Sequence, residues 1–228
     1  MRVLAIDTAL GACSVAVLDT ARSGAIAARE SVPMARGHAE ALMPLVERAM
    51  KEAGLEFAAL DRIAVTTGPG SFTGLRVGIS AARGIALAAE KPAVGLSTLV
   101  AFAAPHIAAD DTRPVAAAID ARHDHVYLQI FGAGGHTLMP PRIVSARDAA
   151  RTAAAETARV IGSGARMLAA HWPSDAAAPI DIDASAAPDI DWVARLGAAA
   201  PEPLAPPRPL YLRAPDARPQ DAAQLPRR

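Results

Sequence analysis

The 228-residue sequence contains one cysteine, few aromatic residues and no excess of either charge. Because Cys13 is the only cysteine, the chain has no intramolecular disulfide framework and no zinc site built from cysteines. Aromatic residues make up 4% of the chain, so stacking of nucleic-acid bases is not expected as a main activity. The 23 basic and 23 acidic residues argue against a broad cationic face for nucleic acid, although a local basic patch is still possible.

Long apolar runs are also missing. No stretch of 18 uncharged apolar residues occurs, and the start of the chain, MRVLAIDTAL, has a strand pattern rather than that of a signal peptide. The hydrophobic share of 52% includes 57 alanines, but the larger apolar residues are still numerous enough to fill folded domains. We therefore expect a cytoplasmic protein that does not enter a membrane.

The order of apolar segments predicts two α/β lobes joined near residues 110–113. In the first half the pattern predicts strands over 3–6, 14–18, 25–30, 63–67 and 93–96, and helices over 38–53, 75–89 and 98–109. In the second half it predicts strands over 115–119, 126–131 and 159–162, helices over 145–157 and 189–200, and a helical turn over 164–170.

A weak internal repeat supports this division. Ala5-Ile6-Asp7 and Ala118-Ile119-Asp120 each precede a second strand pattern, as expected of two related lobes. The expected boundaries are 1–110 for the first lobe and 111–213 for the second. Eight prolines follow position 200, so we expect an edge segment over 210–213 and a disordered tail over 214–228.

Asp7-Thr8, at the end of the first predicted strand, is the first candidate site. Actin-like ATPases and sugar kinases hold a phosphate and its metal with an aspartate in this position and backbone N–H groups of the following turn. Here the turn has one glycine, Gly11, and no lysine. We therefore favour a structural role in which Asp7 caps the turn.

A second candidate is the glycine-rich stretch GPGSFTGLR (68–76), which lies between a predicted strand and a predicted helix. Leu75-Arg76 stands where a Walker loop needs lysine and serine or threonine, and Thr73 stands where a dinucleotide fingerprint needs glycine. The loop glycines are therefore expected to serve sharp turns and close backbone approach. They are Gly68, Gly70 and Gly74.

The remaining reactive residues form no recognisable site. The six histidines include no His-x-x-x-His pair, and His123 and His125 are expected in a solvated turn. Ser71 has no base near it in the sequence and no Gly-x-Ser-x-Gly context. We expect no catalytic residue, no metal ligand and no bound cofactor.

The two helices of the first half have unusual faces. The helix over 38–53 has an apolar arc wider than contact with one sheet requires, and the helix over 75–89 continues a stripe of small residues spaced by four: Gly74, Gly78, Ala82 and Ala86. Internal packing explains both features, and so does a surface for another subunit. On the second interpretation the interface residues are Leu42, Leu45, Val46, Ala49, Leu75, Gly78, Ile79 and Ala82.

Four segments together resemble the bacterial TsaB family: LAIDTALGACSVAVLD (4–19), HAEALMPLVERAM (38–50), TTGPGSFTGLRVGISAARGIALA (66–88) and AIDARHDHVYLQIF (118–131). The resemblance is strong over residues 1–132 and looser through VIGSGA (160–165) to PLYLR (209–213). It implies an α/β, actin-like (ASKHA) two-lobed fold of duplicated ribonuclease-H-like units.

The same resemblance implies a function. TsaB is a subunit in the formation of N6-threonylcarbamoyladenosine (t6A) at position 37 of tRNAs, as a non-catalytic partner of the transferase TsaD, with TsaE as the associated ATPase. It implies a heterodimer with TsaD. We also expect a homodimer when the chain is alone and an indirect link to tRNA through the complex, and the sequence leaves open whether the chain touches tRNA directly. TsaD-like proteins bind a metal through a His-x-x-x-His pair, which this chain lacks. An active actin-like ATPase or phosphotransferase is the main alternative, and a metallopeptidase is a weaker one.

Overall fold

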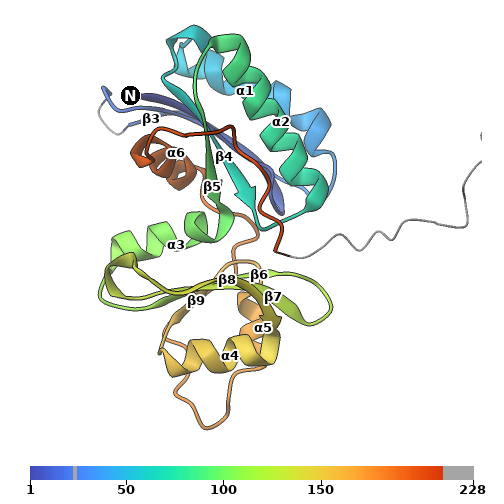
Figure 1. The fold of residues 1–228 in the computed structure, drawn as a ribbon, viewed down its shortest axis with the longest axis vertical. Helices are drawn as coiled ribbons and strands as arrows, with labels where there is room; N and C mark the ends of the chain where they lie inside the picture. Colours follow the sequence, from blue (N-terminus) through green and yellow to red (C-terminus); the bar gives the residue numbers. More distant parts are fainter. Residues whose placement is uncertain (23–24, 213–228) are drawn as a thin grey trace, which may run out of the picture.

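The computed structural model describes residues 1–22 and 25–212, which form two stacked α/β lobes (Figure 1). The first lobe contains a five-stranded sheet in the order β3-β2-β1-β4-β5. The strands are β1 (Arg2–Asp7), β2 (Ala12–Asp19), β3 (Ile26–Pro33), β4 (Arg62–Gly68) and β5 (Ala93–Ser97). β1 pairs antiparallel with β2 and parallel with β4. Because β1 is central and covered on both faces, it reads as a continuous apolar run rather than an alternating one.

The second sheet repeats this topology. Its strands are β6 (Val115–Asp120), β7 (His125–Phe131), β8 (Thr137–Ser145), β9 (Arg159–Ile161) and β10 (Ile182–Asp183), in the order β10-β9-β6-β7-β8. β6 pairs antiparallel with β7 and parallel with β9, as β1 does with β2 and β4. The predicted α/β fold of two related lobes is confirmed.

The helices form three layers around the two sheets (Figure 1). α1 (His38–Ala53) and α2 (Phe72–Ala89) cover the outer face of the first sheet, and α4 (Ala146–Ala155) and α5 (Ala165–Ala170) cover the outer face of the second. α3 (Thr98–Ala109) and α6 (Ile190–Ala199) lie between the sheets, α6 on the first and α3 on the second. Short 3₁₀ turns, η1 (Phe57–Ala59) and η2 (Ala133–Gly135), complete the elements. Within the described residues no helix is both long and apolar enough to cross a membrane.

The C-terminal part of the described chain returns to the first lobe. Ile190 and Val193 of α6 pack with Val3 and Ala5 on the inner face of the first sheet. The following segment, 201–212, is called the strap here. The assignment of residues 190–212 to the second lobe is therefore wrong, because it followed chain order rather than packing. The predicted tail, 214–228, lies outside the described residues.

The strap runs beside the exposed edge of β5. The Leu210 N–H donates to the Thr67 carbonyl oxygen at 2.8 Å, and Pro207 lies against Gly95, where an added Cβ would be 3.1 Å from the Pro207 Cβ. A proline-rich segment beside a sheet edge leaves few groups to pair with a further strand. Residues 210–212 of the predicted edge segment lie in this strap without strand structure, and Arg213 lies outside the described residues.

Several other elements differ from the sequence prediction, among them α2, β8 and β10 (Ile182–Asp183), the last of which was not predicted. α2 begins at Phe72 rather than at Leu75, because the Ser71 hydroxyl accepts a hydrogen bond from the Gly74 N–H and caps the helix. β8 was not predicted, and it contains Pro140 and Pro141. β8 is an edge strand, where proline is tolerated because only one side of the strand needs its N–H groups for pairing.

The small-residue stripe of α2 faces the protein interior. A Cβ added at Gly74 would lie closer than 3.0 Å to the Thr8 carbonyl oxygen, and one added at Gly78 would lie equally close to the Thr8 hydroxyl. The absence of side chains at these two positions therefore lets α2 approach the turn after β1. Gly84, on the exposed side of the same helix, has no atom within 4 Å of its added Cβ.

Gly78→Ala is expected to lower the free energy of unfolding by about 1–3 kcal/mol, because the added methyl group overpacks the contact with Thr8. Gly84→Ala is the matched control. It should raise the stability by up to about 1 kcal/mol, since alanine is the better helix former and the added methyl meets no neighbour. Denaturant unfolding of the lone chain as a monomer measures both. Equal effects of the two substitutions would contradict the close approach of α2 to the turn.

Candidate functional site

The carboxyl end of β1 is buried and internally bonded. Asp7 is fully buried, and its Oδ1 atom accepts hydrogen bonds from the Thr66 hydroxyl at 2.5 Å and from the Ala9 N–H at 3.3 Å. The other carboxylate oxygen, Oδ2, has no hydrogen-bond partner among the described residues. Burial raises the pKa of Asp7 to about 6, against the opposing effects of the Thr66 and Ala9 hydrogen bonds and the nearby His38.

The turn after β1, residues 8–11, is covered from three sides by the chain itself. From the glycine-rich loop, the Ser71 N–H donates to the Ala9 carbonyl oxygen at 2.7 Å. From the segment before α6, the Ala186 carbonyl oxygen accepts from the Gly11 N–H at 3.2 Å. From α1, His38 Nε2 donates to the Leu10 carbonyl oxygen at 3.1 Å. Two N–H groups of this turn, those of Ala9 and Gly11, are therefore engaged within the chain.

The three loop glycines allow this closure. An added Cβ at Gly70 would lie closer than 3.0 Å to the Ala9 carbonyl oxygen, and one at Gly74 would meet Thr8. Gly68 has a φ of 116°, in the region that favours glycine, and an added Cβ there would be 2.9 Å from the Leu210 carbonyl oxygen. The glycines of this loop thus allow its backbone to come close to the turn after β1 and to the strap. This agrees with the expectation from the sequence, which matches neither the Walker loop nor the dinucleotide fingerprint.

The eight residues proposed as an interface do not form a free surface. Their relative exposures lie between 0% and 3% where a value is given, and Gly78 is also buried. These residues are Leu42, Leu45, Val46, Ala49, Leu75, Gly78, Ile79 and Ala82. The apolar arc of α1 is wide because it meets both the sheet and α2 within one core, so the choice of these residues is wrong.

The exposed side of α2 carries a second stripe, two residues out of phase with the first. Its members are Phe72, Arg76, Ser80, Gly84 and Ala88, again spaced by four. From Ser80 onward the stripe consists of small residues, and Leu87 beside it is 82% exposed. We call Ser80, Arg83, Gly84, Leu87 and Ala88 the crest of α2. A helix with such a crest can be approached closely by another helix.

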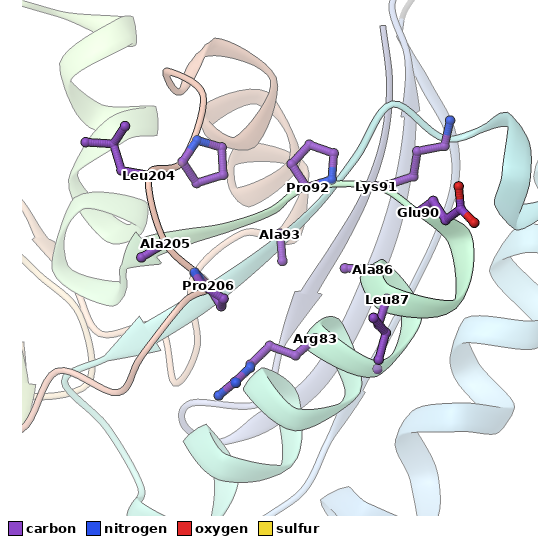
Figure 2. A pocket seen from close by; sticks show the side chains of 12 residues that line it. Arg83, Ala86, Leu87, Glu90, Lys91, Pro92, Ala93, Leu204, Ala205 and Pro206 are labelled. Carbon is purple, nitrogen blue, oxygen red and sulfur yellow. The ribbon is translucent and has the colours of Figure 1, made fainter.

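Grooves flank the crest on both sides. Figure 2 shows the groove on the strap side, of about 730 Å³, with Arg83 and Leu87 of α2 on one side and Leu204 and Pro206 of the strap on the other. The opposite groove, of about 630 Å³, lies toward α1 and η1 and includes Met43, which is 49% exposed. The crest and its grooves offer apolar contact area that residues 1–22 and 25–212 do not cover.

An aromatic–cationic cluster holds the strap against the start of α2. The Phe72 and Tyr211 rings lie with their centroids 5.4 Å apart, and the Arg76 guanidinium lies 3.6 Å from the Phe72 centroid. Arg76 Nε also donates to the Tyr211 hydroxyl at 3.2 Å. The sequence prediction missed this cluster, because Phe72 and Tyr211 are far apart in the chain.

The other candidate groups remain separate. Ser71 acts as the N-cap of α2. His123 and His125 lie exposed around the turn between β6 and β7, where they were expected. Within residues 1–22 and 25–212, no three His, Cys, Asp or Glu residues are grouped so that they could hold a metal ion.

The raised pKa of Asp7 predicts a measurable effect of pH on stability. The folded chain holds the extra proton between the ordinary pKa of 3.8 and about 6, so raising the pH through this window destabilises the fold. The Asp7→Asn variant has no proton to lose at this position, so its free energy of unfolding should not fall in this window. The difference in the free energy of unfolding, variant minus original chain, should therefore rise by up to about 3 kcal/mol between pH 4 and pH 7. Unfolding curves at both pH values test this, and a constant difference would contradict burial of the charged form.

A family model described as "TsaD: tRNA N6-adenosine threonylcarbamoyltransferase" matches residues 32–201. An Escherichia coli (strain K12) protein named "tRNA threonylcarbamoyladenosine biosynthesis protein TsaB" is 42% identical over 128 residues, which are 56% of this chain and 53% of the relative. A tRNA N6-adenosine threonylcarbamoyltransferase of Erythrobacter litoralis is 36% identical over 132 residues, 57% of this chain and 38% of the relative. The matches thus span about half or less of these relatives' length.

A crystal structure from Pseudomonas aeruginosa, of a protein described as similar to peptidase YEAZ, is 30% identical and superposes with a TM-score of 0.77. The superposition covers 93% of this chain and 99% of that structure. The two-lobed arrangement is therefore shared over nearly the whole described chain. The family model, the TsaB-named relative and this structure agree with the resemblance of the sequence motifs. The chain belongs to the family described by the TsaD model, among the members named TsaB.

Proposed function

We propose that this chain is an accessory subunit in the formation of N6-threonylcarbamoyladenosine at adenosine 37 of tRNAs. In this proposal it binds the threonylcarbamoyl transferase TsaD and does not itself transfer the group. The observation that carries the proposal is the closed turn after β1 in a chain whose family includes transferases.

A transferase or ATPase of this fold needs the turn after its first strand to be open to a phosphate. Here Ala9 and Gly11 donate their N–H groups to Asp7 and Ala186, and the Ser71 N–H closes over the Ala9 carbonyl. Asp7 is fully buried and accepts a hydrogen bond from Thr66. These contacts support a role in assembly rather than in chemistry.

The crest of α2 is the proposed site of contact with TsaD. Ser80, Gly84 and Ala88 let a partner helix come close, and Leu87 and Met43 offer apolar side chains beside it. Arg76, held by Phe72 and Tyr211, adds a positioned guanidinium at one end. Aromatic and arginine side chains of this kind are enriched among the residues that dominate binding energy. The same face is proposed to pair with a second copy when TsaD is absent.

We assign the two other partners, TsaE and tRNA, to the complex with TsaD and not to the crest of α2. TsaE is proposed as the ATPase of the complex, and tRNA as its substrate. The main alternative, an active actin-like ATPase or phosphotransferase, requires the turn after β1 to open. The metallopeptidase alternative has no support from a metal-binding group among the described residues.

Gly84→Arg and Leu87→Glu are expected to weaken binding to a TsaD homologue by tenfold or more. The first places a large side chain where the partner helix must approach, and the second buries an unpaired charge. Both positions are exposed, so the lone chain should keep its circular dichroism spectrum, and as a monomer it should unfold at no lower temperature than the original chain. Size exclusion with light scattering measures the complex, and threonylcarbamoylation of tRNA should fall in parallel.

Leu138→Glu is the matched control, because Leu138 is a 45% exposed apolar residue on β8 of the other lobe. It should leave binding and threonylcarbamoylation unchanged. If both crest variants bind TsaD as tightly as the original chain does, the interface lies elsewhere. That result would overturn the proposal that the crest contacts TsaD.

A further inference from the structure

We propose that a pocket on the outer face of the second lobe binds phosphate groups of the RNA on which the assembly acts. The pocket has a volume of about 560 Å³ and lies between α4 and the segment that follows α5. Its lining residues with ionisable side chains are Arg147, Arg151, His171 and Asp175. The choice of RNA as the source of the phosphate rests on the proposed function, whereas the pocket is independent of the α2 crest.

Two arginines on one helical face define the site. Arg147 and Arg151 are four residues apart on α4, which places them one turn apart on the same side. Both are exposed, and neither has a carboxylate within 4.0 Å or another hydrogen-bond partner for its guanidinium among the described residues. In contrast, Arg29 and Arg48 of the first lobe form ion pairs with Asp191 and Glu30.

His171 completes the pocket from the opposite side. Its Nδ1 atom donates to the Met167 carbonyl oxygen at 3.0 Å, which fixes the ring, and its Nε2 atom is 3.6 Å from a carboxylate oxygen of Asp124. The Asp124 carbonyl oxygen accepts from the Ala146 N–H at the start of α4. The turn between β6 and β7, with the exposed Arg122, therefore lies beside the Arg147 end of the helix.

The carboxylates in this region do not neutralise the arginines. The Asp148 side chain accepts a hydrogen bond from the Ser145 hydroxyl at the N-cap of α4. Asp175 lies on the pocket lining but forms no ion pair within 4.0 Å with any residue that the structure describes, and Asp124 is next to His171. An anionic ligand could therefore bind the guanidinium groups of Arg147 and Arg151. Repulsion from the Asp175 carboxylate would keep its negative groups on the arginine side of the pocket.

Phosphate is the anion that this arrangement suits. A guanidinium presents a planar set of N–H donors that match two phosphate oxygens, and arginine remains charged at any physiological pH. Two such groups one helical turn apart can contact neighbouring phosphates of a strand. The chain as a whole carries no net charge, so the contact would be local, in keeping with a subunit that adds to RNA binding by its partner rather than replacing it.

The test measures binding of fluorescently labelled unmodified tRNA by the TsaD complex of this chain, from 50 to 200 mM salt. The variant is Arg147→Gln with Arg151→Gln. The matched control is Arg195→Gln with Arg208→Gln, which removes two exposed arginines elsewhere that have no carboxylate partner within residues 1–22 and 25–212. We expect the pocket variant to weaken tRNA binding about tenfold and to lower the salt dependence by about 1 to 2 in log–log slope. The control should change neither quantity beyond the general effect of two charges.

The conservative variant, Arg147→Lys with Arg151→Lys, should restore most of the salt dependence. Each variant is also tested for TsaD binding by light scattering, which the pocket residues should not affect, so a failed assembly is separated from a failed RNA contact. Equal tRNA affinity of the pocket and control variants overturns the proposal. The original chain and the pocket variant are also compared for binding of inorganic pyrophosphate. If the pocket variant loses pyrophosphate binding while its tRNA binding is unchanged, the pocket binds a small phosphate ligand, and the proposal of an RNA contact is overturned.

Discussion

The approach of α2 to the turn after β1 is the contact on which the rest of the structure depends. Gly74 and Gly78 leave no side chain between the helix and Thr8, whose hydroxyl donates to the Gly74 carbonyl oxygen at 2.7 Å. This contact closes the end of the first sheet over Asp7. It also fixes the rotation of α2, so that Leu75 and Ile79 enter the core and Gly84 faces outward. The same packing of α2 therefore buries the end of β1 under one face of the helix and leaves the face with Gly84 exposed.

Duplication of the lobe gives the molecule its two outer helical layers. Both sheets have the same strand order, and α3 and α6 fill the space between them. α2 of the first lobe carries the crest of mostly small residues beside Leu87, whereas α4 of the second lobe carries two arginines without a carboxylate partner among the described residues. The same topology therefore presents chemically different surfaces on opposite sides of the molecule. A subunit that contacts a protein on one side and RNA on the other is consistent with this division.

Most of the elements could be predicted from the sequence, because apolar runs and helix caps act locally. The strands over 3–6 and 115–119 and the end of α1 at Gly54 follow from such signals. β8 was missed because two prolines suppress a strand signal that an edge position tolerates. The return of α6 to the first sheet carries no local signal, since the contact of Val193 with Val3 joins distant parts of the chain.

The candidate site was harder to predict, because two stripes of small residues share one helix. The spacing of Gly74, Gly78 and Ala82 is the same as that of Ser80, Gly84 and Ala88, and spacing alone does not say which stripe is exposed. The neighbouring Leu75, Ile79 and Ile85 would have placed the first stripe inside, since large apolar residues mark the buried face of an amphipathic helix. The cluster of Phe72 and Tyr211 and the pocket beside Arg147 need the folded chain to bring their parts together.

The central claim is that the buried end of β1 has a structural role and that the chain assists the transfer through its surface. Threonylcarbamoylation of tRNA by a reconstituted TsaD system, with Asp7→Asn in place of the original chain, tests this claim most directly. Asp7 is fully buried and bonded to Thr66, so the account predicts the same initial rate with either form at equal concentrations of assembled complex. A tenfold or greater loss of rate, with the complex intact, would show that Asp7 takes part in the chemistry and would contradict the account.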